Sequence, residues 1–520
     1  MICSLSPRRK RAAVFAVLFI GILAVYLARA TASGLWFDES IEYYFSSSLQ
    51  GSVPGARGDY SMYKRILTTY QPPLYNWLMY VWLSILDSEF WFRLAGILVT
   101  FIGSAGLYLG LKEIMDRDWA AAGSAAYLLA GGVSEYALEA GEYNLLLCMM
   151  CWVLCFYLRA LRKEKSGDLF GFIVFCCLAV YSQYGAVFLI VPMYGALAWH
   201  FLKRKKKTGN LIAFSLLAAA AAVPLVVYFL LPQMQNQGSA AVSHRPVFAY
   251  GVIDPFVGLA KTVFFSFKDE TRLQFAAAVA VGALALTALQ GKNKTLIHLL
   301  LLFICGWVSY YLITACTFYG YNGTFTPDKL GTANIGGRYS LGFAPLLTAT
   351  LVYGVYCACS LKIEKKTWLT AKRKMIAALC LLMIFSAFGF ASLLCAKPKD
   401  DVREAVQVWY EKKAYESKTL IDNWDDPIFQ FYVTHHPDYS EAYQDRLILA
   451  PWWGSENPAL MKNALDDIKL LDADDFYYLS YSSETYEKHA LIIRQLFMDC
   501  GFTVELPYQG ISTLIHAFRE

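Results

Sequence analysis

Charged residues are scarce in this chain. They make up 17% of its 520 residues, whereas 57% of the residues are apolar or aromatic; a soluble domain has roughly 25% charged residues. Many of the acids lie at one end, because residues 397–520 hold 22 of the 41 acids and carry a net charge of −10. This composition excludes a soluble enzyme and a disordered chain. It predicts a protein that spans a membrane many times and carries one water-soluble domain.

Cysteine is nearly absent from the C-terminal part. Only Cys500 of the thirteen cysteines lies beyond residue 396, and all others except Cys3 lie in or beside apolar runs, which excludes a disulfide framework. Cys148, Cys151 and Cys155 recur at helical spacing, as metal ligands on one helix face would. No histidine or carboxylate accompanies them, so the pattern favours packing over metal binding.

The N-terminal apolar run lacks the small-residue cleavage site of a signal peptide. It follows the basic cluster Arg8–Arg11 and continues to about Ala30, so we interpret it as a membrane anchor that is retained. The positive-inside rule places this cluster and the later ones in the cytoplasm. The later clusters are Arg159–Lys165, Lys203–Lys207, Lys292–Lys294 and Lys362–Lys374.

Twelve apolar stretches follow one another along the chain. If all of them crossed the membrane, the basic clusters after residue 160 would lie on the wrong side. Leaving out residues 73–87 corrects every later cluster, and this stretch is short, follows Pro72 and is rich in Trp and Tyr, as an interfacial helix is. The remaining predicted spans are 12–31, 93–111, 119–134, 143–160, 169–182, 184–202, 211–232, 272–290, 295–316, 339–360 and 375–396.

The sequence therefore predicts a polytopic α-helical membrane protein with about eleven transmembrane helices. Residues 1–396 form the membrane domain, with long exterior loops at 32–92 and 233–271, and long loops are usually functional. The first loop is expected to contain helices lying in the membrane plane. Residues 397–520 alternate between helix-like and strand-like runs, which predicts a small exterior α/β domain. Its expected helices are 402–413, 458–470 and 484–498, and its expected strands are 419–422, 446–450, 476–481 and 513–518.

Two adjacent carboxylates follow the first predicted span. Asp38 and Glu39 lie where the dielectric constant falls toward the membrane, and a falling dielectric raises a carboxylate pKa and suits a general base. Alternatively, Asp38 is only the N-cap of a helix that runs to about Leu49. The two interpretations are compatible, because a cap residue is also rigidly placed.

Other polar residues lie at the outer ends of predicted spans. Glu139 and Glu142 belong to the second exterior loop. Arg338, which precedes Tyr339, follows two glycines that allow a close backbone approach. Its guanidinium either binds a phosphate or extends to lipid head groups. In the tail, His435 and its neighbour His436 are interpreted as a solvated turn rather than a metal site.

These motifs resemble the GT-C superfamily of membrane glycosyltransferases. The nearest groups are the protein O-mannosyltransferases and the lipid A aminoarabinose transferases, on the basis of Asp38-Glu39, Pro72-Pro73-Leu74-Tyr75 and Arg338-Tyr339. The resemblance implies inverting transfer of a hexose or pentose from a polyprenyl-phosphate carrier on the exterior face. In this interpretation Asp38 is the general base, and Glu39 positions it or the acceptor. The residues expected to bind substrate are Arg338, Tyr339, Glu139, Glu142, Lys64, Arg65, Tyr75, Arg93 and Lys329.

The chain departs from this family pattern at two places. Gln71 stands where bacterial relatives commonly have His or Lys, and Gly141-Glu142-Tyr143 stands where they often have Arg-Pro-Tyr. Both differences remove a cation near the expected phosphate. Lys64, Arg65 and Lys329 are the candidates to replace it.

The expected partners are a polyprenyl-phosphate sugar donor, membrane lipids and an acceptor that is a glycan, a lipid or a protein; no nucleic acid is expected. No cofactor is required, and a divalent metal is possible but not indicated. The expected location is the inner or plasma membrane, with a cytoplasmic N-terminus. The alternative is a multi-span transporter or lipid flippase, which should carry ionisable groups at mid-membrane. The predicted spans are nearly free of them, with His298 as an exception, so the sequence favours an enzyme.

Overall fold

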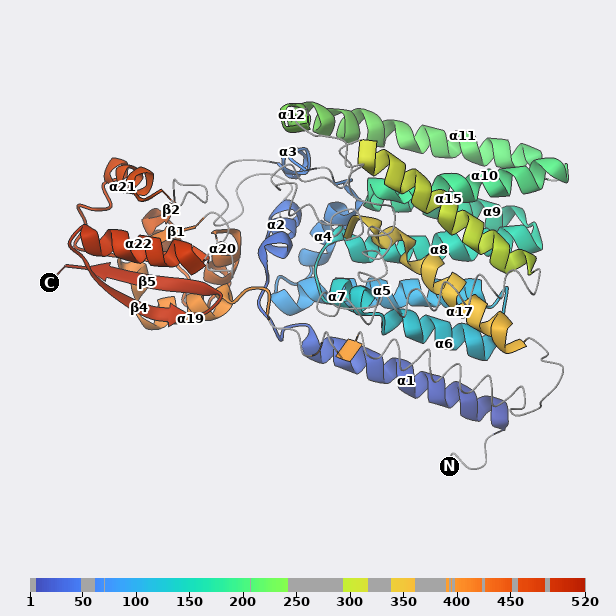
Figure 1. The fold of residues 1–520 in the computed structure, drawn as a ribbon, viewed down its shortest axis with the longest axis horizontal. Coiled ribbons are helices and arrows are strands. Elements are labelled where there is room, and N and C mark those ends of the chain that lie inside the picture. Colours follow the sequence, from blue (N-terminus) through green and yellow to red (C-terminus); the bar gives the residue numbers. More distant parts are fainter. Residues whose placement is uncertain are drawn as a thin grey trace. The chain divides into compact units, whose positions relative to one another are not determined.

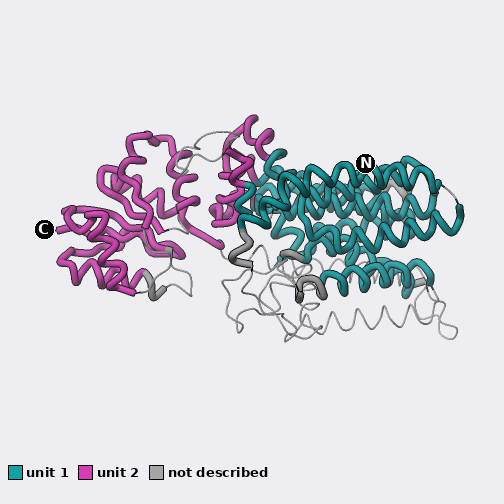
Figure 2. Tube along the Cα trace, turned by 90° about the horizontal axis from the view of Figure 1, so that it is seen from above, with its two compact units in different colours: residues 1–29, 66–78, 93–396 teal, residues 30–65, 79–92, 397–520 magenta. Residues whose placement is uncertain are grey.

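The described residues of this computed structural model form two compact units (Figure 2). We call residues 1–29, 66–78 and 93–396 the membrane unit, and residues 30–65, 79–92 and 397–520 the loop–tail unit. The structure describes residues 6–47, 61–69, 71–205, 207–241, 293–316, 338–360, 390–391, 394, 398–422, 426–450, 457–481 and 487–519.

Long apolar helices running side by side make up the membrane unit (Figure 1). Within the described ranges, six helices are long and apolar enough to cross a membrane, and two further apolar helices are shorter. The predicted spans 272–290 and 375–396 lie wholly or mostly outside the described residues. The helices are α1 (Pro7–Arg29), α5 (Glu89–Leu111), α6 (Arg117–Leu128), α7 (Gly131–Ala137), α8 (Glu142–Lys163), α9 (Ser166–Ser182), η2 (Tyr184–Ala186), α10 (Val187–Lys203), α11 (Thr208–Leu225), η3 (Val226–Leu230), α12 (Leu231–Ala241), α15 (Lys294–Cys316), η4 (Arg338–Phe343) and α17 (Ala344–Ser360).

Two expectations about the apolar stretches can be compared directly with the helices. Helix α4 (Leu74–Leu83) has ten residues, so it is about 15 Å long, half of a hydrocarbon core of about 30 Å. This length agrees with the prediction that residues 73–87 do not cross the membrane. The predicted span 119–134 is not one continuous helix, because α6 ends at Leu128 and a separate helix, α7, begins at Gly131. Its crossing of the membrane stays a prediction.

Glycines on α5 allow its backbone to approach α8 closely. A Cβ added at Gly103 would lie 2.8 Å from the Cα of Cys148, and one added at Gly110 would lie 2.9 Å from the Cα of Cys155. Small residues at such a spacing let two membrane helices pack backbone to backbone. The three cysteines recurring along α8 are all buried, as the sequence pattern favoured, and Cys148 and Cys155 lie against α5.

The tail contains a five-stranded sheet with the order β2-β1-β3-β5-β4. The first three strands are parallel and the last two pairings are antiparallel, so the predicted α/β class is confirmed. The strands are β1 (Lys418–Ile421), β2 (Leu447–Leu449), β3 (Asp475–Tyr481), β4 (Thr503–Gln509) and β5 (Ser512–Phe518). The helices are α19 (Val402–Glu411), η5 (Ala414–Glu416), α20 (Asp426–Thr434), η6 (Glu441–Arg446), α21 (Pro458–Asp467) and α22 (Glu487–Asp499).

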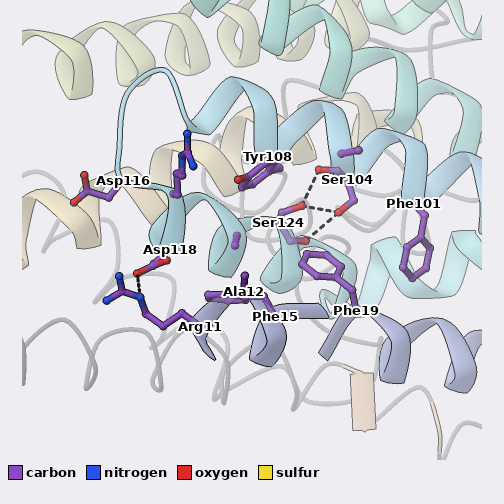
Figure 3. Close-up of a pocket in the computed structure, with 13 residues that line it drawn as sticks. Arg11, Ala12, Phe15, Phe19, Phe101, Ser104, Tyr108, Asp116, Asp118 and Ser124 are labelled. Carbon is purple, nitrogen blue, oxygen red and sulfur yellow. Dashed lines mark hydrogen bonds and ion pairs between the residues drawn. The ribbon is translucent and has the colours of Figure 1, made fainter. Parts of the chain in front are cut away.

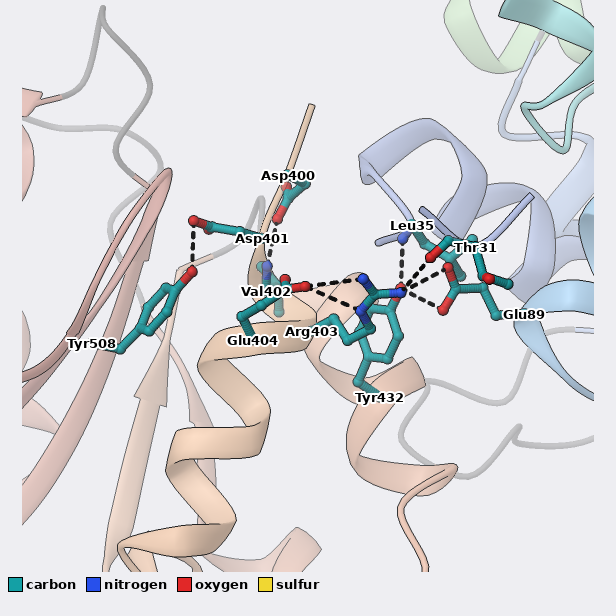
Figure 4. A network of polar contacts seen from close by, with 10 residues as sticks. All are labelled: Thr31, Leu35, Glu89, Asp400, Asp401, Val402, Arg403, Glu404, Tyr432 and Tyr508. Atoms are coloured by element: carbon teal, nitrogen blue, oxygen red, sulfur yellow. Dashed lines mark hydrogen bonds and ion pairs between the residues drawn. The ribbon is translucent and has the colours of Figure 1, made fainter. Parts of the chain in front are cut away.

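Two neighbouring acids at the start of the tail have different surroundings. Asp401 accepts hydrogen bonds from the Tyr508 hydroxyl at 2.8 Å and from the backbone N–H groups of Ile511 and Ser512 at 2.6 Å each, so it caps the turn between β4 and β5. Asp400 accepts a 2.9 Å bond from the N–H of Val402 (Figure 4). Asp400 is only 3% exposed, and burial, together with the charge of Asp401, raises its pKa to about 7.

We expect Asp400→Asn to stabilise the protein more at pH 8 than at pH 5. The folded-state pKa of Asp400 lies above the unfolded value of about 3.9, so the folded state loses stability as pH rises from about 4 to 7. Asparagine keeps an acceptor for the Val402 N–H and cannot ionise. Thermal melting of the full chain at several pH values measures the effect, with the exposed Asp467→Asn on α21 as the control. A gain that does not grow between pH 5 and pH 8 would contradict it.

Candidate active site

The predicted base, Asp38, lies on a short helix of the loop–tail unit. Helix α2 runs from Phe37 to Ser46, and its N-cap residue is Trp36. The Glu39 carboxylate accepts the N–H of Trp36 at 3.3 Å, which closes the first turn. The expectation that Asp38 is the N-cap is therefore wrong: it is the second helical residue, and the capping carboxylate belongs to Glu39. The predicted end near Leu49 is also wrong, because the helix ends at Ser46.

Asp38 and Glu39 differ in exposure. Glu39 is only 1% exposed, whereas Asp38 is partly exposed. Both lie in the first turn of α2. Asp38 is therefore fixed on a helix while its side chain stays partly exposed.

Three cations of the loop–tail unit, Lys64, Arg65 and Lys399, lie on segments that contact α2 or the residue directly before it. The Arg65 guanidinium of α3 (Met62–Ile66) donates to the backbone carbonyl of Tyr44 on α2, and burial lowers its pKa. Lys64 is exposed. The ammonium of Lys399 lies 4.5 Å from the centre of the Trp36 ring, directly before α2. Lys399 lies far from residue 36 in sequence and belongs to no motif, so sequence reasoning missed it.

In the membrane unit, the first turns of α5 and the start of α8 adjoin. Arg93 and Glu142 are 3% and 4% exposed, and Glu139 is partly exposed. A Cβ added at Gly96, one turn after Arg93, would lie 2.6 Å from the Asn144 amide nitrogen and 3.4 Å from the Glu139 carbonyl oxygen. The Asn144 amide itself donates to that carbonyl at 3.1 Å. A buried arginine and two predicted acids therefore lie on adjoining segments.

Helix η4 brings two further predicted residues to the same helix, α8. Arg338 is its first residue and Tyr339 its second. Gly342 of η4 lies against the side chain of Leu146, one turn after Glu142. Lys329 lies outside the described residues. The part of α5 near Arg93 and the helix η4 that begins at Arg338 thus both contact the first turns of α8, although about 245 residues separate them in sequence.

A buried glutamine holds the segment that leads to Tyr75. Gln233 of α12 is 0% exposed; its amide donates to the carbonyls of Ile66 at 3.0 Å and Gln71 at 2.7 Å, and it accepts the Tyr184 hydroxyl at 2.9 Å. Tyr75, four residues after Gln71, is 4% exposed. Gln233 follows an apolar run without any motif, so sequence reasoning did not select it.

Comparison with known proteins identifies the fold. Residues 70–229 match the family model Dolichyl-phosphate-mannose-protein mannosyltransferase. ArnT from Cupriavidus metallidurans in the apo state is similar in structure, with a TM-score of 0.59, 13% identity and 98% coverage of both chains. Its complex with undecaprenyl phosphate gives a TM-score of 0.59, 12% identity, and coverage of 96% of this chain and 97% of that one. The chain has the GT-C fold of membrane glycosyltransferases. A search of curated sequences finds no match.

The GT-C resemblance and the fold class expected from the sequence are thus confirmed. The number of eleven membrane spans stays a prediction.

A cavity of about 850 Å³ lies between α1, α5 and α6 (Figure 3). An ion pair between Arg11 and Asp118, 3.0 Å apart, lies in its wall. None of the predicted site residues that the structure describes is among the residues lining this cavity.

The two tail histidines have different surroundings. His435 lies 3.3 Å from an Asp87 carboxylate oxygen; burial lowers its pKa, but the hydrogen bond and charge of Asp87 outweigh burial and raise it. The His436 ring stacks on Tyr410 at 3.6 Å between centroids. Across the described ranges, no group of three or more His, Cys, Asp or Glu residues is arranged to hold a metal.

Proposed function

We propose that this protein transfers a sugar from a polyprenyl-phosphate carrier to an acceptor at the exterior face of a cell membrane, with inversion. The observation that carries the proposal is the first turn of α2, where Glu39 closes the helix and leaves the partly exposed Asp38 in a rigid position. The GT-C fold supports a glycosyltransferase. The match to a dolichyl-phosphate-mannose family model and the undecaprenyl phosphate bound to a similar structure support a lipid-phosphate donor.

Asp38 acts as the general base in this proposal. Its carboxylate takes the proton of the acceptor while the acceptor's nucleophilic atom bonds to the anomeric carbon, and the bond from that carbon to the phosphate oxygen breaks. The carrier phosphate leaves as an anion, so no acid has to protonate it. A hydrolase pair differs, because one carboxylic acid must protonate the leaving oxygen. The leaving phosphate needs only cationic or hydrogen-bonding support.

The donor is a lipid-linked hexose or pentose rather than a nucleotide sugar. The candidate residues belong to predicted exterior segments, whereas nucleotide sugars are cytoplasmic. Arg338, Tyr339 and Lys329 serve the donor phosphate, and the exposed Lys64 is a further cation for it. Glu139 and Glu142 are the candidates to position the sugar or the acceptor, and Tyr75 and Arg93 are further candidates to bind substrate. Arg65 has a structural contact with α2 and is the weaker candidate.

The decisive experiment measures breakage of the donor. Purified protein in lipid vesicles is given undecaprenyl phosphate carrying mannose, arabinose or aminoarabinose, or a nucleotide sugar, and release of free undecaprenyl phosphate is followed. We expect release from a lipid donor when an acceptor extract is present. Transfer across the vesicle membrane with the donor intact would favour the transporter alternative. Turnover of a nucleotide sugar alone would contradict the proposed donor class.

We expect Arg338→Ala to weaken donor use about tenfold or more, because a charge-assisted bond to phosphate contributes roughly 1.5–3 kcal/mol. Arg338→Lys should recover only part of this, since lysine lacks the planar guanidinium that binds two oxygens together. The measurement is the donor concentration dependence of carrier release. Unchanged dependence in Arg338→Ala would assign Arg338 to lipid head groups instead.

A further inference from the structure

The tail contacts the backbone directly before α2. The N–H of Leu35, which is 0% exposed, donates to the hydroxyl oxygen of Tyr432 on α20 at 2.5 Å. The same hydroxyl donates its own proton to Glu89, 3.2 Å away (Figure 4). One phenol therefore joins α20 to the segment before α2 and to the chain at residue 89, within the loop–tail unit.

Arg403 of α19 makes a second connection to the same two loop segments. Its guanidinium donates to the carbonyl of Thr31 at 3.1 Å and lies 3.5 Å from a Glu89 carboxylate oxygen. It also contacts Glu404 at 3.0 Å on its own helix, which orients the guanidinium. Glu89 thus contacts both Tyr432 and Arg403 from the tail.

A third connection lies further along α2. The hydroxyl of Tyr43, which is 5% exposed, donates to Asp87 at 2.8 Å, and the other oxygen of Asp87 lies 3.3 Å from His435. The ring of Tyr43 also contacts Phe431 edge to face, with centroids 4.8 Å apart. Helix α2 is thus held before its first turn and again at Tyr43, one turn after Glu39.

We propose that Tyr432 is a positioning residue for the base Asp38, and that the tail acts as part of the catalytic apparatus through this contact. The inference rests on the proposed function, since it assumes that Asp38 is the base. Asp38 lies between the two points at which α2 is held, three residues after Leu35 and five before Tyr43. A displacement of about 1 Å at a reacting group can cost about 100-fold in rate. Tyr432 acts through the backbone of residue 35 and takes no part in the chemistry.

The test compares two Tyr→Phe variants, each of which loses one buried hydroxyl group. Tyr432→Phe removes the acceptor of the Leu35 N–H and the donor to Glu89. Tyr410→Phe on α19 is the matched control, because the buried Tyr410 hydroxyl donates only to the carbonyl of Val433 within the tail, at 3.1 Å, among the contacts described for it. Hydrogen–deuterium exchange of residues 35–46 and carrier release are measured for both full-length variants, together with their melting temperatures.

We expect Tyr432→Phe to speed exchange at residues 35–46 about tenfold, and to lower kcat about tenfold or more while the donor KM changes less than twofold. Tyr410→Phe should leave both exchange and kcat at the wild-type level. In the Asp38→Asn background, Tyr432→Phe should cause no further loss, because the group that it positions is already inactive.

Two results separate this inference from the proposed function. The positioning role is overturned if Tyr432→Phe leaves exchange at residues 35–46 unchanged. It is also overturned if Tyr432→Phe lowers kcat as much in the Asp38→Asn background as in the wild type. Either result leaves the glycosyltransferase proposal intact. Wild-type turnover in Asp38→Asn overturns the proposed base, and with it the purpose of the positioning, even if exchange at residues 35–46 has risen.

Discussion

Asp38→Asn should lower turnover by 10² to 10⁴-fold, the usual effect of losing a general base. Asparagine is nearly the same size as aspartate and cannot accept the acceptor's proton. Folding should be almost unchanged, because the carboxylate that closes the first turn of α2 belongs to Glu39. Release of undecaprenyl phosphate from the active lipid-linked sugar measures turnover, and binding of undecaprenyl phosphate alone shows whether the donor site is intact.

Glu39→Gln is the matched control for this substitution. Its amide oxygen can still accept the Trp36 N–H at the position where the carboxylate now lies, 3.3 Å away. We therefore expect a milder loss than for Asp38→Asn. If Asp38→Asn keeps wild-type turnover, or if Glu39→Gln is the more damaging change, Asp38 is not the base.

The second large effect is structural: Gly103→Val should strongly destabilise the membrane unit. The added Cβ would lie 2.8 Å from the Cα of Cys148, and a backbone atom cannot rotate away as a side chain can. Overpacking of a well-packed interior typically costs about 1–3 kcal/mol, and this contact joins two backbones. We expect a clearly lower melting temperature in detergent and a smaller yield of folded protein.

Gly195→Val on α10 is the matched control for Gly103→Val. Gly195 is exposed, also lies inside an apolar helix, and an added Cβ there meets no atom within 4 Å among the described residues. It should therefore melt close to the wild-type temperature. Equal melting of the two variants would show that α5 and α8 are not closely packed at Gly103.

Two elements of the tail show where sequence patterns were insufficient. Strand β4 was not predicted because Pro507 interrupts it, and proline is unfavourable inside a sheet. The sheet accommodates Pro507 because β4 is its edge strand and its register with β5 shifts between Glu505 and Tyr508. Helix α20 was missed because its nine residues are rich in aromatic and β-branched side chains, which favour a strand.

The sequence by itself determined the features that depend on local composition and period. Apolar runs of about twenty residues predict membrane helices because the hydrocarbon core has a fixed thickness. Alternating runs beyond residue 396 predicted the α/β tail, which the sheet confirmed. The Asp38-Glu39 pair could be selected because two adjacent acids directly after an apolar run lie where the dielectric constant falls, which suits a general base.

Tertiary structure alone decided which residues touch across long sequence distances. The contacts of Leu35 with Tyr432, of Glu89 with Arg403 and of Gln233 with Gln71 join residues that share no local pattern. It also decided that Glu39 rather than Asp38 closes the first turn of α2, since aspartate is favoured at the N-cap and glutamate at the third helical position, so the sequence allows either start. Such contacts depend on how separate segments pack, and packing arises from the whole chain rather than from any window of sequence.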